Sequence, residues 1–284
     1  MSPCRLGLLT ATLLAAGACA DSDGDSGTGP PSRDSSRSGS LPAGDIQLAY
    51  TLDLPRGAGP FPAVALVHGS GPSTRDELTP LSRLLVARGL AVLRYDKRGV
   101  GGSGGTYRGV GVANSPDMIP LLAGDAAAAV DFLSRQPDLD GERLGLVGAS
   151  QAGWIIPVAA TLAPRVRFAV ILVGPTVSVG REIYYSELAE RSELPLDDAE
   201  EALTTFTGAE GFDPLPYLDQ VDVPVLWLYG LMDRSIPTRS CLAVHRTIEA
   251  EHDFALLVYD QLGHALAASV WSDVYPWLDK QLGE

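Results

Sequence analysis

From Asp45 onward, short apolar runs alternate with stretches of helical spacing, and this alternation leaves few folds open to the chain. The run FPAVALVHGSG, residues 61–71, is apolar almost throughout, which is typical of a strand buried on both faces. LTPLSRLLVARG, residues 78–89, has helical spacing and ends in a glycine that can act as a C-cap. Further strands are predicted over 46–55, 90–96, 143–150, 167–174, 223–230 and 254–260. We therefore predict an α/β fold with a mostly parallel central sheet, right-handed crossovers and helices on both faces.

The interval between Gly174 and Val223 breaks this alternation, because it contains no strand pattern. Two helices are predicted within it, over 178–194 and 196–206. A segment inserted after a parallel strand lies above the carboxyl ends of the sheet, where ligands bind in such folds. We predict a compact helical lid over about 175–220, inserted before the strand at 223–229. The alternative is a plain long connection packed on the side of the domain.

The first 19 residues have the composition of a signal peptide. Arg5 is followed by an apolar run from Leu6 to Ala18, which is too short to span a bilayer comfortably. The small residues before Cys19 resemble a bacterial lipobox, and that resemblance implies lipidation of Cys19. We expect an exported protein, anchored in the membrane through Cys19 or, as the alternative, secreted after cleavage near Ala18 or Ala20.

A polar segment separates this leader from the first predicted strand. Residues 21–40 contain almost no apolar side chain, so they cannot bury enough surface to offset the entropy lost on ordering. We predict a disordered linker over 20–44 and a single α/β domain over 45–284. With a lipid on Cys19, this linker would hold the domain at a distance from the membrane.

The formal net charge of −14 argues against nucleic acid as a partner, because binding to phosphates requires a basic face. Of the three cysteines only Cys241 belongs to the predicted domain, so no internal disulfide is expected. With four histidines and no HExxH pattern, no cluster of metal ligands is visible. We expect neither a metal nor another cofactor.

The stretch LVGASQAG, residues 146–153, places Ser150 between a predicted buried strand and a helix rich in small residues. A nucleophilic serine at such a turn needs small neighbours two positions before and after it, and Gly148 and Ala152 meet that need. Gly153 is interpreted as a packing residue that lets the helix approach the sheet. The pattern alone is weak, because serine is also common at ordinary strand-to-helix turns.

A carboxylate and a histidine follow Ser150 in the order that a serine nucleophile requires. Asp233 comes just after the strand at 223–229, and His264 comes just after the strand that ends near Asp260. A histidine can accept the proton of the serine hydroxyl, and a carboxylate can orient that histidine. Asp260 is an alternative carboxylate, and Asp222 is less suitable because it precedes its strand.

Two backbone N–H groups are candidates for an oxyanion hole. Gln151 follows the serine at the start of a helix, and Ser70 lies in the turn HGSGP after an early strand. His68 opens that turn and is expected to bind loop backbone rather than to catalyse. Asp96, Lys97 and Arg98 follow another strand and are interpreted as a charged turn that holds loops together by ion pairs.

These motifs together resemble the α/β-hydrolase superfamily from about Asp45 to the end of the chain. The resemblance rests on HGSGPSTRDE, LRYDKRGVGGSGG, GASQAG, GLMDRSIPT and LGHAL. It is similar in particular to bacterial carboxylesterases, dienelactone hydrolases and serine aminopeptidase-like hydrolases. The resemblance implies an α/β-hydrolase fold and a Ser150–His264–Asp233 triad that works without a cofactor.

We expect the substrates to be carboxylic esters of small or short-chain compounds. Tyr184, Tyr185 and Phe206 on the predicted lid are candidates for an acyl pocket.

Three other functions remain open at this stage. Glu182, Glu187 and Glu190 on the predicted lid could bind the free amine of a short peptide, as a serine aminopeptidase requires. A thioesterase is the second alternative. The third is a surface-anchored binding lipoprotein without catalytic activity, which the complete serine, aspartate and histidine set disfavours.

Overall fold

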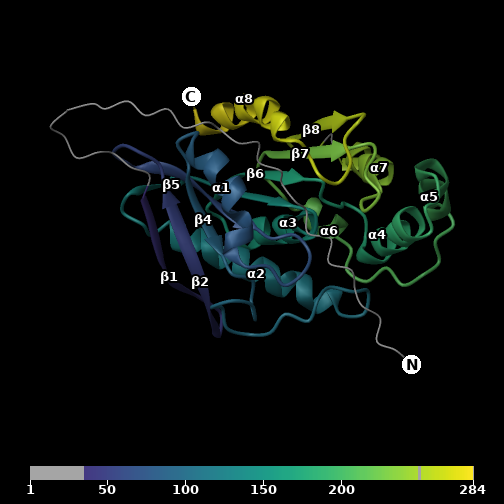
Figure 1. Ribbon diagram of the computed structural model, residues 1–284, viewed down its shortest axis with the longest axis horizontal. Coiled ribbons are helices and arrows are strands. Elements are labelled where there is room, and N and C mark those ends of the chain that lie inside the picture. Colours follow the sequence, from purple (N-terminus) through teal and green to yellow (C-terminus); the bar gives the residue numbers. More distant parts are fainter. Residues whose placement is uncertain (1–34, 249–250, 284) are drawn as a thin grey trace, which may run out of the picture.

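The computed structural model describes residues 35–248 and 251–283, and an eight-stranded sheet runs through it (Figure 1). The strands are β1 (Ser35–Ala43), β2 (Ile46–Leu54), β3 (Phe61–Val67), β4 (Ala91–Tyr95), β5 (Leu139–Ala149), β6 (Val166–Leu172), β7 (Val225–Gly230) and β8 (Phe254–Tyr259). Their order is β1-β2-β4-β3-β5-β6-β7-β8. The six strands from β4 to β8 in this order pair in parallel, and β2 is antiparallel to both of its neighbours. This arrangement confirms the predicted mostly parallel α/β sheet.

Strand β1 corrects the predicted boundary of the domain. The linker predicted over 20–44 is wrong for residues 35–43, which pair with β2 along their whole length. Because β1 is an edge strand with only Leu41 and Ala43 buried, backbone pairing rather than apolar burial holds it, and its polar sequence hid it. A two-residue Gly44-Asp45 turn joins the two strands and is the sequence signal that could have revealed the hairpin.

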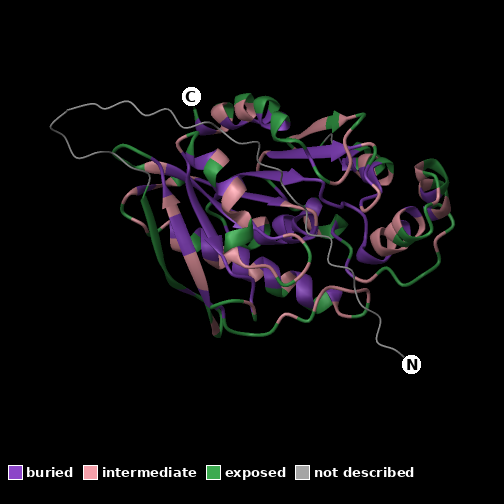
Figure 2. Cartoon of the chain, viewed as in Figure 1, coloured by how far each residue is buried: buried purple, intermediate pink, exposed green. Residues whose placement is uncertain are grey.

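Helices cover both faces of the sheet, as the alternating sequence pattern predicts. One apolar core lies under α2 (Ser115–Leu133), α3 (Ala152–Leu162) and α7 (Thr238–Ile248). A second core lies under α1 (Thr79–Val86) and α8 (Trp271–Leu282). Figure 2 shows β4 and β7 buried throughout, and β3 is buried except at Phe61. The parallel strands therefore keep the continuous apolar character that identified them in the sequence.

The segment predicted as a lid forms three helices and a π-helical turn. They are α4 (Val179–Ser186), the π-helical turn η2 (Glu187–Arg191), α5 (Leu196–Leu203) and α6 (Leu215–Leu218). The Ser178 hydroxyl caps α4 by accepting a hydrogen bond from the Arg181 backbone N–H. Tyr185, Ala189 and Leu203 form part of a small apolar core within the segment. In Figure 1, α4 and α5 lie at the end of the molecule opposite β1 and β2.

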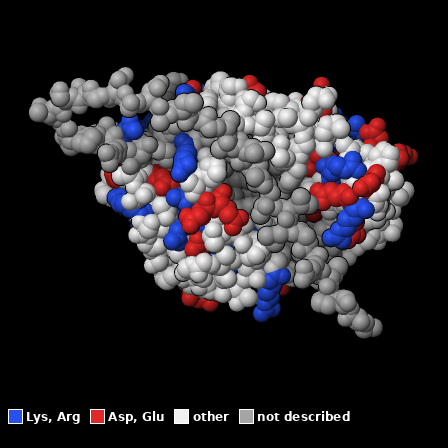
Figure 3. Space-filling view, viewed as in Figure 1, with Lys and Arg blue, Asp and Glu red and all other residues white. Residues whose placement is uncertain are grey.

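Charged side chains of both signs lie next to one another on the face seen in Figure 3. Over the lid, Arg181 pairs with Glu210 at 3.0 Å and Arg239 pairs with Asp197. Exposed ion pairs of this kind contribute little to stability.

Several predictions concern residues that the structure does not describe. The signal peptide over 1–19, the lipidation of Cys19 and the part of the linker before residue 35 all lie outside the described residues. Within residues 35–248 and 251–283, no helix has the length and apolar character needed to cross a membrane. In the same part of the chain, no three His, Cys, Asp or Glu side chains are grouped closely enough to hold a metal ion.

Candidate active site

Ser150 occupies a sharp turn between β5, which ends at Ala149, and α3, which begins at Ala152. Its φ of 57° lies in the left-handed region, which a residue with a side chain adopts only at an energetic cost. The Ser150 N–H donates to the Leu172 carbonyl of the next strand at 2.9 Å, so the turn is fixed to the sheet. Such a turn lifts a serine side chain above the carboxyl end of its strand.

The small residues around Ser150 are sterically required. A Cβ atom at Gly148 would lie 2.5 Å from the Ala152 Cβ and 2.8 Å from the Val67 carbonyl oxygen. A Cβ atom at Gly153 would lie 2.6 Å from the Gly174 Cα. These contacts confirm that Gly148 allows the turn and that Gly153 allows α3 to pack against the chain beyond β6.

Asp233 and His264 come together from the loops after β7 and β8. The Asp233 Oδ2 atom lies 2.9 Å from His264 Nδ1. Its Oδ1 atom accepts hydrogen bonds from the backbone N–H groups of Ser235 at 2.8 Å and Ile236 at 2.9 Å. Asp233 is 1% exposed, whereas the His264 side chain keeps 24% of its surface open to solvent. The carboxylate is therefore fixed, and the imidazole it holds remains accessible to a substrate.

The pKa of His264 reflects two opposing effects. Burial lowers it, but the hydrogen bond to Asp233 and the charge of that carboxylate outweigh burial, so the pKa lies above its ordinary value of 6.5. A carboxylate on Nδ1 also fixes the tautomer in which Nε2 is free to accept a proton. The pair can therefore act as an oriented base.

The turn after β3 lies directly beside the serine. A Cβ atom added at Gly69 would be 3.6 Å from the Ser150 Cβ, so the backbone on either side of Ser70 passes close to the serine. Gln151 is 3% exposed and precedes the first residue of α3, where backbone N–H groups have no acceptor within the helix. Both candidate oxyanion donors thus border Ser150.

His68 behaves as the sequence predicts. It is 2% exposed, and its Nε2 atom lies 2.5 Å from the Tyr95 carbonyl oxygen. Burial, followed by the charge of Lys97, lowers the pKa of His68 to about 4, so its imidazole is neutral. It therefore supports the turn through the Tyr95 carbonyl.

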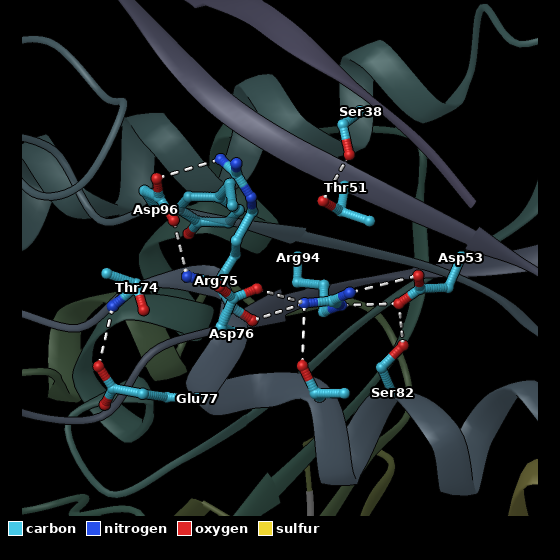
Figure 4. Close-up of polar contacts among 12 residues, drawn as sticks. Ser38, Thr51, Asp53, Thr74, Arg75, Asp76, Glu77, Ser82, Arg94 and Asp96 are labelled. Carbon is cyan, nitrogen blue, oxygen red and sulfur yellow. Dashed lines mark hydrogen bonds and ion pairs between the residues drawn. The ribbon is translucent and has the colours of Figure 1, made fainter.

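The charged turn after β4 is only partly as predicted. Asp96 pairs with Arg75 at 3.1 Å and also accepts from the Arg75 backbone N–H at 2.8 Å (Figure 4). Arg98 forms a buried pair with Asp125 at 2.6 Å. Lys97 instead donates to neutral oxygens around the turn 69–71. The sequence did not reveal this contact, because it joins segments that are distant along the chain.

The three aromatic residues predicted to form an acyl pocket separate into two groups. The rings of Tyr184 and Phe206 lie 5.3 Å apart, and both remain partly exposed. Tyr185 does not fit that prediction, because it is 1% exposed and its hydroxyl donates to the Asp233 carbonyl at 2.7 Å. Tyr185 therefore fixes the loop that carries Asp233, and this role depends on a contact over 48 residues.

The three acidic residues predicted on the lid also fall into two groups, since two lie near the Asp233 loop and one does not. Glu190 accepts a hydrogen bond from the Ser235 hydroxyl, next to the Asp233 loop. Burial, and then the charges of Asp233 and Glu190, raise the pKa of Glu182 to about 8. Glu187 lies apart from them, because it is exposed and pairs with Arg191 at 3.4 Å.

Two curated relatives match most of this chain. It is 24% identical over 246 residues to esterase EstD of Thermotoga maritima, an alignment that covers 77% of this chain and 58% of EstD. It is 26% identical over 251 residues to the acylamino-acid-releasing enzyme of Rattus norvegicus, covering 78% of this chain and 32% of that enzyme. The chain thus spans little more than half of one relative and a third of the other.

A solved structure and a family comparison extend this result. Acetyl xylan esterase 1 from Thermoanaerobacterium superposes with a TM-score of 0.67 over 90% of this chain and 86% of its own, at 20% identity. At that identity the likeness shows the shared fold. Residues 79–284 match the prolyl oligopeptidase family, and this match includes Ser150, Asp233 and His264. The chain belongs to the prolyl oligopeptidase family.

Proposed function

We propose that this protein is a serine hydrolase that transfers an acyl group to water in two steps. Ser150 attacks the carbonyl carbon of the substrate while His264 Nε2 accepts its proton. Asp233 holds the imidazole and stabilises the imidazolium that forms. His264 then donates the proton to the leaving group, and water repeats the same steps on the acyl-enzyme.

The developing oxyanion would be bound by the backbone N–H groups of Gln151 and Ser70. Gln151 offers its N–H from the N-cap position of α3, where the helix dipole favours negative charge. Each such donor contributes about 3 kcal/mol to stabilisation of the transition state.

The observation that carries this proposal is the 2.9 Å hydrogen bond between Asp233 Oδ2 and His264 Nδ1. This hydrogen bond joins the loops that follow two different strands. The serine, aspartate and histidine also occur along the chain in the order typical of such hydrolases, and Ser150 has the strained φ of a nucleophile turn. A histidine held in this way has a defined tautomer and a free Nε2.

Carboxylic esters of small or short-chain compounds are the substrates that we propose. The relative EstD is an esterase by name, and so is the superposed acetyl xylan esterase. Tyr184 and Phe206 supply a partly exposed aromatic surface on the lid that could contact an acyl chain. The net charge of −14 disfavours nucleic acid as a partner.

A peptidase is the second candidate, and the lid carboxylates favour it. The charges of Asp233 and Glu190 help to raise the pKa of Glu182, so negative charge gathers beside the Asp233 loop, and the free amine of a substrate would relieve that repulsion. The rat relative is named as an acylamino-acid-releasing enzyme.

The test compares p-nitrophenyl butyrate, aminoacyl-p-nitroanilides and an acyl thioester on purified wild-type protein and Ser150→Ala. We expect the wild type to prefer the p-nitrophenyl ester and Ser150→Ala to be inactive on all three. Faster turnover of the anilides would replace the ester proposal with the peptidase. Faster turnover of the thioester would replace it with a thioesterase.

We also propose that the protein is exported and anchored through a lipid on Cys19, on the basis of the leader sequence. In a bacterial host, wild type should partition with membranes and incorporate labelled palmitate. Cys19→Ser should do neither, and a soluble, unlabelled wild type would contradict the anchor.

A further inference from the structure

Lys97 lies between the two segments that would form the oxyanion hole, which are the turn containing Ser70 and the start of α3 at Gln151. Its side chain is buried, with 2% of the residue exposed, behind the turn that follows β3. The Nζ atom donates to the carbonyl oxygens of Gly69 at 2.5 Å and Gly71 at 2.9 Å, which flank Ser70 on both sides. The same atom donates to the Gln151 side-chain Oε1 at 3.2 Å. One ammonium group thus joins both segments whose backbone N–H groups would bind the oxyanion.

The number of contacts matches the chemistry of an ammonium group. Three oxygens surround Lys97 Nζ, and a charged lysine has three N–H groups to donate. The ring of Tyr107 covers the ammonium at 4.5 Å, and the Tyr107 hydroxyl accepts from the Gly71 backbone N–H at 3.2 Å. The turn is therefore held through both its carbonyl and its N–H groups.

Lysine is rare in this chain, which makes its use at this position informative. Only two of the 21 basic residues are lysines, Lys97 and the exposed Lys280 of α8, and the others are arginines. The planar guanidinium of arginine suits two parallel hydrogen bonds to a carboxylate, whereas a compact ammonium can donate to three acceptors that converge on one point. The geometry around Nζ is of the second kind.

We propose that Lys97 is a positioning residue that holds the Ser70 and Gln151 backbone N–H groups at a fixed separation for the transition state. This inference rests on the proposed function, because it assigns a role within that oxyanion hole. An oxyanion hole is effective when its donors are already oriented before charge develops. Lys97 touches no reacting atom and acts only through the two segments it joins.

The protonation state of Lys97 should affect how kcat depends on pH. Burial lowers the pKa of Lys97 to about 7, although Glu77 opposes the shift. The other groups beside it are the neutral imidazole of His68 and the ring of Tyr107, and the carboxylate of Asp96, the preceding residue, lies near that same imidazole. Above that pKa the amine keeps only two N–H groups, so one of its three acceptors loses its partner.

The test uses Lys97→Met, which keeps an unbranched side chain one atom shorter and removes the ammonium, with Lys280→Met as the matched control. Both are assayed with the p-nitrophenyl ester on full-length protein, and competent molecules are counted by titration with a fluorophosphonate. Loss of one oxyanion donor costs about 10²–10³-fold in kcat, so a misplaced pair should cost about 10- to 100-fold. We expect kcat per competent site to fall by that factor in Lys97→Met with KM little changed. Lys280→Met should match wild type.

The pH profile separates positioning from packing. We expect the wild-type kcat to decline on the alkaline side, and Lys97→Met to lack this decline. Lys97→Arg, which keeps the charge, should recover part of kcat at high pH. Profiles of identical shape in wild type and Lys97→Met, or a kcat per competent site within about twofold, would overturn the proposal.

Two further results keep the test decisive. If Lys97→Met does not fold, Gln151→Met removes one acceptor of Lys97 but keeps the backbone N–H. It should lower kcat by a smaller factor, and an unchanged kcat would overturn the proposal. Failure of the proposed function itself would look different, because wild-type protein would then neither turn over the ester nor react with the fluorophosphonate at Ser150.

Discussion

Replacing Asp233 with asparagine tests how the histidine is oriented. The Asp233 Oδ1 atom already accepts two backbone N–H groups, from Ser235 and Ile236, and only Oδ2 faces His264. The single oxygen of an asparagine must therefore stay at the Oδ1 position, which turns the amide NH₂ toward His264 Nδ1. The imidazole then carries its proton on Nε2, where it cannot accept the proton of Ser150.

The size of the effect follows from this reversal of the tautomer. Replacing the aspartate of such a triad with asparagine lowers kcat by about 10⁴, which corresponds to about 5 kcal/mol of transition-state stabilisation. Stability should change little, because asparagine has the shape of aspartate and keeps both backbone hydrogen bonds. The loss should therefore appear in kcat and not in the melting temperature.

The assay measures kcat for p-nitrophenyl butyrate and follows unfolding by circular dichroism. Asp260→Asn is the matched control, since Asp260 is an exposed carboxylate that also follows a strand near His264. Its kcat should stay within about twofold of wild type, as for other surface substitutions. A loss below about tenfold in Asp233→Asn would refute the reasoning, as would a larger loss in Asp260→Asn.

Three further predictions follow from the same site. In the proposed mechanism His264 is a base only when neutral, and its pKa is raised, so kcat/KM should fall as the pH drops through a value above 6.5; a midpoint clearly below 6.5 in the pH–rate profile would contradict this. Gly148→Ala should lower the free energy of unfolding by about 1–3 kcal/mol through overpacking. Gly124→Ala in α2, where a Cβ meets nothing within 4 Å, should raise it by about 0.5–1 kcal/mol, and equal urea midpoints for the two variants would contradict the steric argument. Tyr185→Phe should cost about 1–3 kcal/mol because it leaves a buried carbonyl without its donor, and an unchanged urea midpoint would count against that role.

The fold could be predicted from the sequence wherever burial shaped the residue pattern. Strands β3, β4, β6 and β7 are buried almost throughout, so their apolar runs were visible. The carboxyl ends of β5, β7 and β8 indicated where Ser150, Asp233 and His264 would lie. Strand β1 was missed because its pairing is through the backbone and its side chains are mostly exposed. Apolar periodicity cannot detect such an edge strand.

The supporting residues of the site could not be predicted in the same way. Tyr185 looked like a pocket residue because it lies beside Tyr184 on a lid helix, but the helix directs its hydroxyl to the Asp233 carbonyl. Lys97 looked like one member of a charged turn, whereas its acceptors lie 26 to 54 residues away along the chain. Such roles depend on tertiary contacts that no local pattern records.

The most direct test of the central claim is the site of covalent labelling by a fluorophosphonate. Intact-mass spectrometry of the wild type should show one adduct per molecule, and peptide mapping should locate it at Ser150. Ser150→Ala should remain unlabelled, and Asp233→Asn should label far more slowly than wild type. A wild-type protein that stays unmodified, or an adduct on another residue, would contradict the account.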